Sequence, residues 1–434
     1  MTAEIVIMNK HGVALAADSA VSIGSSKVYN SANKLFALSK RYPVGIMIYG
    51  SADFMDTPWE TVIKYYRSTH LKNKHFETLQ DYYFDFIEFL QSTTIFPKDS
   101  EARYFIRVAV GACTEIKTLI NDKIKSAFNH GEGVDENTVR SITKESIKQI
   151  RDHSATLTQS VLFARSNRDE VLNSHESSLS NVISRIFENL YIDTEDRDGI
   201  ANIILNIIGC CDIEHEQGHT GIVIAGYGEK EIFPCMAAMR IQGRLGNYLR
   251  LQHVEDNESE PYSASISPFA QREMVDMFMC GADPEITKHM ISSFDEVVRK
   301  IPELLVEKLN YNIDAENELV TLRSEIESFS KTANSKIAEF QNNNYIQPIL
   351  ASVNALPLDE LASMAESLVN LTSFKRRVTM VQESVGGPID VAVISKGDGL
   401  IWIKRKHYFS SELNHHYFSN LSRDDNGHRN QPND

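Results

Sequence analysis

Apolar and polar residues alternate in two different rhythms along this chain of 434 residues. Short apolar runs bounded by turn residues predict strands, whereas apolar residues at steps of three and four predict helices. The predicted strands are 3–8, 13–17, 34–38, 44–49, 221–227, 232–241, 389–394 and 400–403, the last two joined by the turn Lys396-Gly397-Asp398-Gly399. Helices are predicted over 58–209, 284–344 and 358–377, and Ser263–Pro268 is expected to open a short helix through Met279 after a polar loop at 256–259.

The second helical region carries two apolar stripes. One consists of Leu319, Leu322, Ile326, Phe329, Ala333, Ile337 and Phe340, and the other of Ile286, Met290, Phe294, Val297, Ile301 and Leu305. This spacing is typical of a coiled-coil-like hairpin. We expect the two stripes to pack against each other, with a docking surface for a partner as the alternative.

The order of these patterns predicts a strand-rich core interrupted by two helical insertions. The core parts are expected at 2–57, 220–283 and 356–410, the insertions at 58–219 and 284–355. Residues 419–434 are polar and without periodicity, which predicts a disordered tail.

Composition narrows the class of protein. With 44 Lys and Arg against 59 Asp and Glu, the net charge of -15 argues against nucleic-acid or anionic-membrane binding. The run Lys375-Arg376-Arg377 is short and is expected to be a solvated helix end. Five irregularly spaced cysteines indicate reduced thiols. No signal peptide or apolar run of membrane-spanning length is visible, so we expect a cytoplasmic protein.

The first two predicted strands carry the chemistry. Thr2 opens the first strand, Ala16-Ala17-Asp18-Ser19 ends the second, Lys34 follows, and Gly50-Ser51-Ala52 comes next. This segment resembles the opening of proteasome β subunits and bacterial proteasome-like peptidases, in residue types and in the Thr–Asp and Thr–Lys spacings. The resemblance implies a four-layer αββα sandwich of the α+β class, threonine-type hydrolysis of amide bonds in peptides or proteins, and assembly into a homo-oligomer, with a ring as one form.

Elementary chemistry agrees with the roles that the resemblance implies. A threonine hydroxyl is a weak nucleophile, and a free α-amino group with a pKa of about 7.7–8.0 can take its proton. Removal of Met1 would give Thr2 that amine. Lys34 would lower the effective pKa of the hydroxyl, Asp18 would orient Lys34, and the Gly50 N–H would stabilise the oxyanion. No cofactor or metal is required.

The resemblance is fainter downstream. By its match, Ser265 would hydrogen-bond the N-terminal amine. An Asp and a Ser that complete the network in that family correspond here to Gln382 and Val385, with Glu383 and Ser384 one place away.

Two alternatives stay open. The altered segment at 382–385 fits a proteasome-like structural subunit without activity. His215-Glu216-Gln217-Gly218-His219 matches the H-E-x-x-H signature of zinc metalloproteases, which needs a helix to bring both imidazoles to one metal. Gly218 and the strand predicted from Gly221 make a polar loop the favoured interpretation of this motif.

Overall fold

The computed structural model describes residues 2–419 with short gaps. The positions outside the description are 24–26, 40, 73, 131–132, 161–162, 164–165, 214–217, 259–262, 303, 305–314, 380–384, 411, 418 and 420–434. Except for Ser419, the predicted tail therefore lies outside the described residues. The chain divides into two compact units, the first formed by Met1–Leu35, Pro261–Ile394 and Leu400–Asp434, the second by Phe36–Glu260 and Ser395–Gly399.

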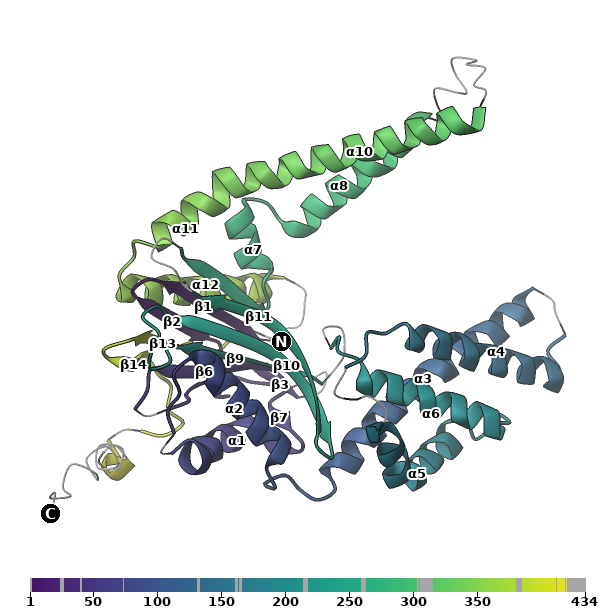
Figure 1. The fold of residues 1–434 in the computed structure, drawn as a ribbon, viewed down its shortest axis with the longest axis horizontal. Coiled ribbons are helices and arrows are strands. Elements are labelled where there is room, and N and C mark those ends of the chain that lie inside the picture. Colours follow the sequence, from purple (N-terminus) through teal and green to yellow (C-terminus); the bar gives the residue numbers. More distant parts are fainter. Residues whose placement is uncertain are drawn as a thin grey trace. The chain divides into compact units, whose positions relative to one another are not determined.

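The first unit contains a five-stranded sheet in the order β12-β1-β2-β13-β14 (Figure 1). Its strands are β1 (Ala3–Asn9), β2 (Gly12–Ala17), β12 (Ser265–Ala270), β13 (Asp390–Ser395) and β14 (Gly399–Lys404). A small hairpin joins β3 (Val21–Ile23) to β4 (Lys27–Tyr29). The predicted strand pairs at 3–8 with 13–17 and at 389–394 with 400–403 are confirmed, because the turn residues between them fix each pairing locally.

Helix α12 (Leu358–Val378) covers one face of β1 and β2 (Figure 1). Alternate residues of β1 point to this face, so Ile5 and Ile7 join Leu361 and Val369 of α12 in a buried apolar cluster. Thr2, Glu4 and Val6 consequently face the opposite side of the sheet. The remaining helices of this unit are α7 (Glu273–Cys280), α8 (Pro284–Arg299), α10 (Ala315–Gln341), η3 (Asn342–Ile346) and α11 (Gln347–Val353).

The second unit contains a sheet in the order β11-β10-β9-β6-β5. Its strands are β5 (Leu35–Ala37), β6 (Val44–Gly50), β9 (Thr220–Gly226), β10 (Cys235–Leu245) and β11 (Tyr248–Glu258), with the short pair β7 (Asp53–Phe54) and β8 (Thr57–Pro58). The helices are α1 (Trp59–Tyr65), η1 (Tyr66–His70), α2 (Leu79–Ser92), α3 (Ser100–Asn129), α4 (Glu136–Ala155), α5 (Ser166–Ile186) and α6 (Thr194–Gly209).

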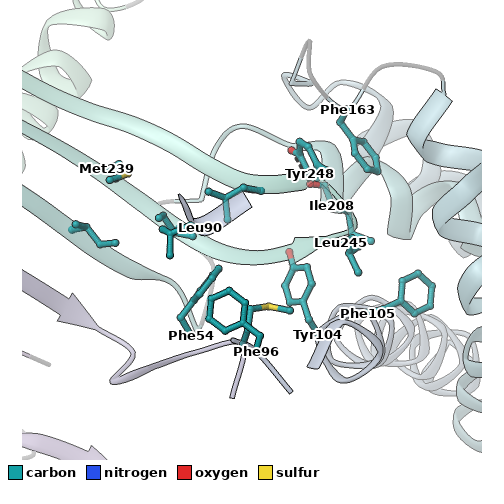
Figure 2. Packing of buried hydrophobic residues seen from close by; sticks show 14 of the residues in the cluster. Phe54, Leu90, Phe96, Tyr104, Phe105, Phe163, Ile208, Met239, Leu245 and Tyr248 are labelled. Atoms are coloured by element: carbon teal, nitrogen blue, oxygen red, sulfur yellow. Dashed lines mark hydrogen bonds between the residues drawn. The ribbon is translucent and has the colours of Figure 1, made fainter. Parts of the chain in front are cut away.

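One continuous apolar cluster joins this sheet to its helices (Figure 2). Phe54 and Phe96 meet edge to face with ring centroids 5.2 Å apart, and Phe163 lies 4.5 Å from Tyr248. Gly243 of β10 is tightly covered by Tyr104 of α3, because a Cβ at Gly243 would come within 2.4 Å of that ring. The cluster makes the helical region after Pro58 part of this unit's core.

The α+β class is confirmed by these two sheets and their helices, while the stacking of the sheets into four layers stays a prediction. Three local predictions are wrong. Ser265–Ala270 is strand β12 because it pairs with β1, and the predicted loop at 256–259 is strand up to Glu258 because it pairs with β10. Arg376 is 8% exposed instead of solvated, because Glu273 binds its guanidinium at 3.0 Å.

The predicted seam between α8 and α10 differs most from expectation. The two helices lie side by side (Figure 1), but most of the two predicted stripes stay exposed. Val298 of α8 and Ser330 of α10 are buried instead, and the Ser330 hydroxyl donates to Asp295. The helices therefore contact each other along faces next to the predicted stripes. Leu305 and the side chain of Leu319 lie outside the description.

Candidate active site

Pairing between β1 and β2 brings Thr2 beside Asp18. Glu4 pairs with Ala17, and beyond that pair the Asp18 N–H donates to the Ala3 carbonyl at 3.1 Å. Thr2 is 3% exposed and faces the side of the sheet away from α12. A tight hairpin thus places two residues sixteen positions apart (18 minus 2) at one end of the sheet.

Asp18 is fully buried and accepts hydrogen bonds on both carboxylate oxygens. Three backbone N–H groups donate to it: Ala3 at 3.2 Å, Ala20 at 3.2 Å and Gly386 at 2.9 Å. Backbone donors stabilise the ionised form of a buried carboxyl. These donors fix the position of the Asp18 carboxyl group.

Lys34 bridges this anion and the Thr2 hydroxyl. Its Nζ lies 2.6 Å from Asp18 Oδ1 and 2.9 Å from Thr2 Oγ1, and the residue is 4% exposed. A charged donor aimed at Thr2 Oγ1 stabilises negative charge that develops there. The arrangement lowers the free-energy cost of deprotonating the hydroxyl, which is what a nucleophile requires.

Glu4 is a further acidic residue on the face of β1 that Thr2 occupies, and the sequence analysis missed it. It is fully buried, and neither carboxyl oxygen has a hydrogen-bond partner among the described residues. Burial raises the pKa of the Glu4 carboxyl well above 4.5, the Lys34 ammonium acts in the opposite direction, and the Asp18 carboxylate adds to the rise. The signal in the sequence is a lone acidic residue in the apolar strand AEIVIM, two positions after Thr2.

The chain after β12 holds Thr2 from its other side. Ala270 adopts a left-handed conformation with φ 63°, and the next residue, Gln271, donates its N–H to the Thr2 carbonyl at 3.1 Å. The buried Arg376 guanidinium donates to the Gln271 side chain. A left-handed residue other than glycine is strained, so its position beside Thr2 fits a site whose backbone is constrained.

A second ion cluster lies in the same unit. The buried Asp390 carboxylate accepts from Arg405 Nη1 at 2.9 Å and from the Lys406 backbone at 2.9 Å, and the Lys406 ammonium also binds it. Burial lowers the pKa of Lys406, the Asp390 carboxylate opposes this, and Arg405 and Lys34 lower it further. The buried Asp390 carboxylate thus balances the positive charges of Arg405 and Lys406 near Lys34.

The structure does not bring Ser265 to Thr2. Ser265 pairs with Met8, six positions along β1 from Thr2, and Ala270 is the residue paired with Ala3. At about 3.3 Å per residue the separation is on the order of 20 Å. The predicted contact between Ser265 and the N-terminal amine is therefore wrong, because the register of a distant strand decides it.

Of the other residues predicted for the site, the structure describes Gly50 and Val385. Gly50 ends β6 in the second unit with φ 85°, and a Cβ there would meet the His219 carbonyl at 2.5 Å, so only glycine fits. Val385 is fully buried in the apolar cluster under α12. Gln382, Glu383 and Ser384 lie outside the described residues.

The metalloprotease motif lacks its helix. His215 and Glu216 lie outside the described residues, but Gly218 has φ 81° and β9 begins at Thr220. A left-handed Gly218 does not allow a continuous helix through His219. Within the described ranges, no three His, Cys, Asp or Glu side chains gather to hold a metal ion.

All five cysteines are free thiols, as the sequence predicts. Among the helices that the structure describes, none is both long and apolar enough to cross a membrane.

Comparison with known proteins gives distant likenesses only. No model of a known protein family matches the chain, and no curated protein resembles it. Similar solved structures include Anbu (ancestral beta-subunit) from Yersinia bercovieri, with 9% identity, a TM-score of 0.28 and coverage of 99% of this chain and 98% of the other. The Anbu (Gly-1) mutant from Hyphomicrobium sp. strain MC1 gives 9% identity, a TM-score of 0.28 and full coverage of both chains. The helical assembly of the Anbu complex from Pseudomonas aeruginosa gives 8% identity and a TM-score of 0.28, with coverage of 99% of this chain and 98% of the other.

These values correct the assignment made from the sequence. Identities of 8–9% and TM-scores of 0.28 establish neither a shared family nor a shared activity. The N-terminal segment predicted membership of the proteasome β-subunit and bacterial proteasome-like peptidase family. This assignment is therefore wrong for this chain. The contacts among Thr2, Asp18 and Lys34 stand independently of it.

Proposed function

We propose that this protein is a hydrolase of amide bonds in peptides, with Thr2 as its N-terminal nucleophile after removal of Met1. The observation that carries the proposal is the buried bridge in which Lys34 Nζ lies 2.9 Å from Thr2 Oγ1 and 2.6 Å from Asp18 Oδ1. Free thiols support a reducing, cytoplasmic location.

The chemistry proceeds in two balanced steps. The freed α-amine of Thr2 accepts the hydroxyl proton, and Oγ1 attacks the carbonyl carbon of the substrate. The C–N bond of the substrate then breaks. The α-amine of Thr2 passes the proton to the leaving amine of the substrate, and an acyl ester remains on Thr2. Water, deprotonated by the same amine, hydrolyses the ester and restores the hydroxyl.

Lys34 and Asp18 serve both steps without touching the substrate. The Lys34 ammonium stabilises negative charge on Thr2 Oγ1. It also favours the neutral form of the nearby α-amine, and only the neutral amine can accept the hydroxyl proton. Asp18 fixes the ammonium, because an unpaired buried charge is costly. We propose the Gly50 N–H as a donor to the oxyanion of the tetrahedral intermediate.

A non-catalytic structural protein is the second candidate. It is favoured by the absence of the expected helpers from the described surroundings of Thr2. Ser265 pairs with Met8 instead, and Val385 is a buried apolar residue. In this case the bridge would only satisfy buried polar groups at the start of β1.

Intact-mass measurement with a peptide epoxyketone separates the two candidates. The reagent forms a stable ring only with a free N-terminal threonine, because it needs both hydroxyl and amine. We expect loss of Met1 and one adduct per chain, absent in Thr2→Ala and present in the surface control Thr69→Ala. Retention of Met1 would overturn the proposal. A processed protein without an adduct or peptidase activity would favour the structural role.

A further inference from the structure

The hairpin of α8 and α10 leaves an extended apolar face exposed. Gln341 at the end of α10 donates to the Cys280 carbonyl just before α8, so the helices run antiparallel. The exposed members of the two stripes are Ile286, Met290, Phe294, Val297 and Ile301 on the α8 side and Phe329, Ile337 and Phe340 on α10, each 39–67% exposed. We define these eight residues as the hairpin face.

Both stripes lie on the same side of the hairpin. Asp295 of α8 accepts the hydrogen bond of Ser330 on α10, and the buried Val298 lies about one turn further along the same side of α8. At about 100° per residue, the α8 stripe is rotated by somewhat less than a right angle from Val298. The α10 stripe is rotated from Ser330, which faces α8, in the same sense and by a similar angle. Equal rotations of two antiparallel helices turn their stripes to one side. The eight side chains therefore form one surface.

The size of this surface is that of a specific interface. A large side chain has an area on the order of 200 Å², so each half-exposed residue contributes about 100 Å². Eight residues give about 800 Å², which exceeds the largest apolar patch of a typical monomer and equals one side of a standard protein–protein interface. A face of this size costs free energy as long as water covers it.

The balanced charges around the face favour a partner surface without strong net charge. Residues 284–300 and 320–341, which carry the stripes, contain six Lys or Arg and six Asp or Glu. Anionic membranes and nucleic acids select basic surfaces, which this is not. The tail at 419–434 has Leu421 as its only large apolar residue, too little to cover the face.

We propose that the hairpin face binds the same face of a second copy of this chain, so that two hairpins form a four-helix bundle. Stripes with steps of three and four on both helices can interdigitate with an identical pair. This inference does not depend on the chemistry of Thr2.

Sedimentation equilibrium of the full chain, from about 1 to 100 µM, tests the proposal. We expect the wild-type protein to dimerise and Met290→Glu/Phe329→Glu to raise the dissociation constant on the order of 100-fold, about tenfold per residue lost. The matched control Phe128→Glu/Ile232→Glu changes side chains that are 74% and 77% exposed in the second unit, and should dimerise like the wild type. Circular dichroism establishes that both variants are folded.

Cross-linking of an equal mixture of ¹⁴N- and ¹⁵N-labelled chains locates the contact. Mixed-label links among Lys288, Lys300, Lys331 and Lys336 are expected, because these lysines lie on the two hairpin helices. A wild-type monomer at all concentrations would overturn the proposal. So would self-association that Met290→Glu/Phe329→Glu leaves intact, or binding of a monomeric wild type to phosphatidylcholine vesicles through these residues.

Discussion

Two regions of the first unit invert the usual distribution of polar and apolar groups. At the start of β1, Thr2, Asp18 and Lys34 are buried and bonded to one another or to backbone N–H groups. On the α8–α10 hairpin, the eight apolar side chains of the hairpin face are exposed. A buried polar group raises the free energy of the folded state unless it is hydrogen-bonded, and an exposed apolar face raises it unless another surface covers the face. The first region is complete within one chain, whereas the second is completed only by another surface.

The largest effect is expected when the buried bridge is broken. Lys34→Ala leaves the Asp18 carboxylate buried without its cation, so the free energy of unfolding should fall by about 3–5 kcal/mol. Peptide hydrolysis should fall with it, by at least about 100-fold. Urea unfolding and peptidase assays of the folded fraction measure the two effects. Lys64→Ala, which removes an exposed i,i+4 pair with Glu60, should change stability by less than about 1 kcal/mol. A loss in Lys34→Ala no larger than this control would contradict a buried, paired ammonium.

The buried Glu4 carboxyl gives a smaller effect that depends on pH. Its folded-state pKa is raised, so between pH 4.5 and that pKa the native state binds more protons than the unfolded state. The stability of the wild type should therefore fall as pH rises above 4.5, relative to Glu4→Gln, by up to about 1.4 kcal/mol per pH unit. Urea unfolding at several pH values tests this against the exposed control Glu325→Gln. A stability difference between wild type and Glu4→Gln that is constant with pH would show that Glu4 keeps an ordinary pKa.

The smallest effects on stability are expected on α8 and α10, where substitutions should distinguish the buried side of the helices from the exposed hairpin face. Val298→Ala removes buried methyl groups and should destabilise the monomer by about 1–2 kcal/mol. Phe329→Ala, at 65% exposure, should change monomer stability by no more than about 0.5 kcal/mol. Thermal unfolding at concentrations below dimerisation measures both. A larger loss in Phe329→Ala would mean that Phe329 is covered within the single chain.

Several features follow from neighbouring residues alone. The apolar alternation of 3–8 and 13–17 and the turn at Asn9–Gly12 predict the first hairpin, and that hairpin places Asp18 beside Thr2. The turn at 396–399 and the periodicity of 358–377 likewise predict β13, β14 and α12. The stripes on α8 and α10 are visible as repeats of three and four. These signals are local because turn chemistry and helix periodicity involve residues close in sequence.

Other features belong to contacts between distant segments. The sequence predicted a helix from Ser263 and a role for Ser265 beside Thr2, but pairing of β12 with β1 puts Ser265 opposite Met8. Arg376 was expected at a solvated helix end, but it is buried and its guanidinium binds Glu273, about a hundred positions away. Glu4 was not singled out from the sequence, and only the tertiary structure shows its carboxyl buried without a hydrogen-bond partner among the described residues.

The local sequence pattern thus determined the hairpin that places Asp18 beside Thr2 and which helix faces are apolar, whereas Lys34 was added by the resemblance. Only the tertiary structure decided the register of β12, the burial of Glu4 and Arg376, and the exposure of the hairpin face. The physical reason is that turns and periodicity act over a few residues. Burial and strand register are set by the free energy of contacts among segments tens to hundreds of positions apart, which no local pattern encodes.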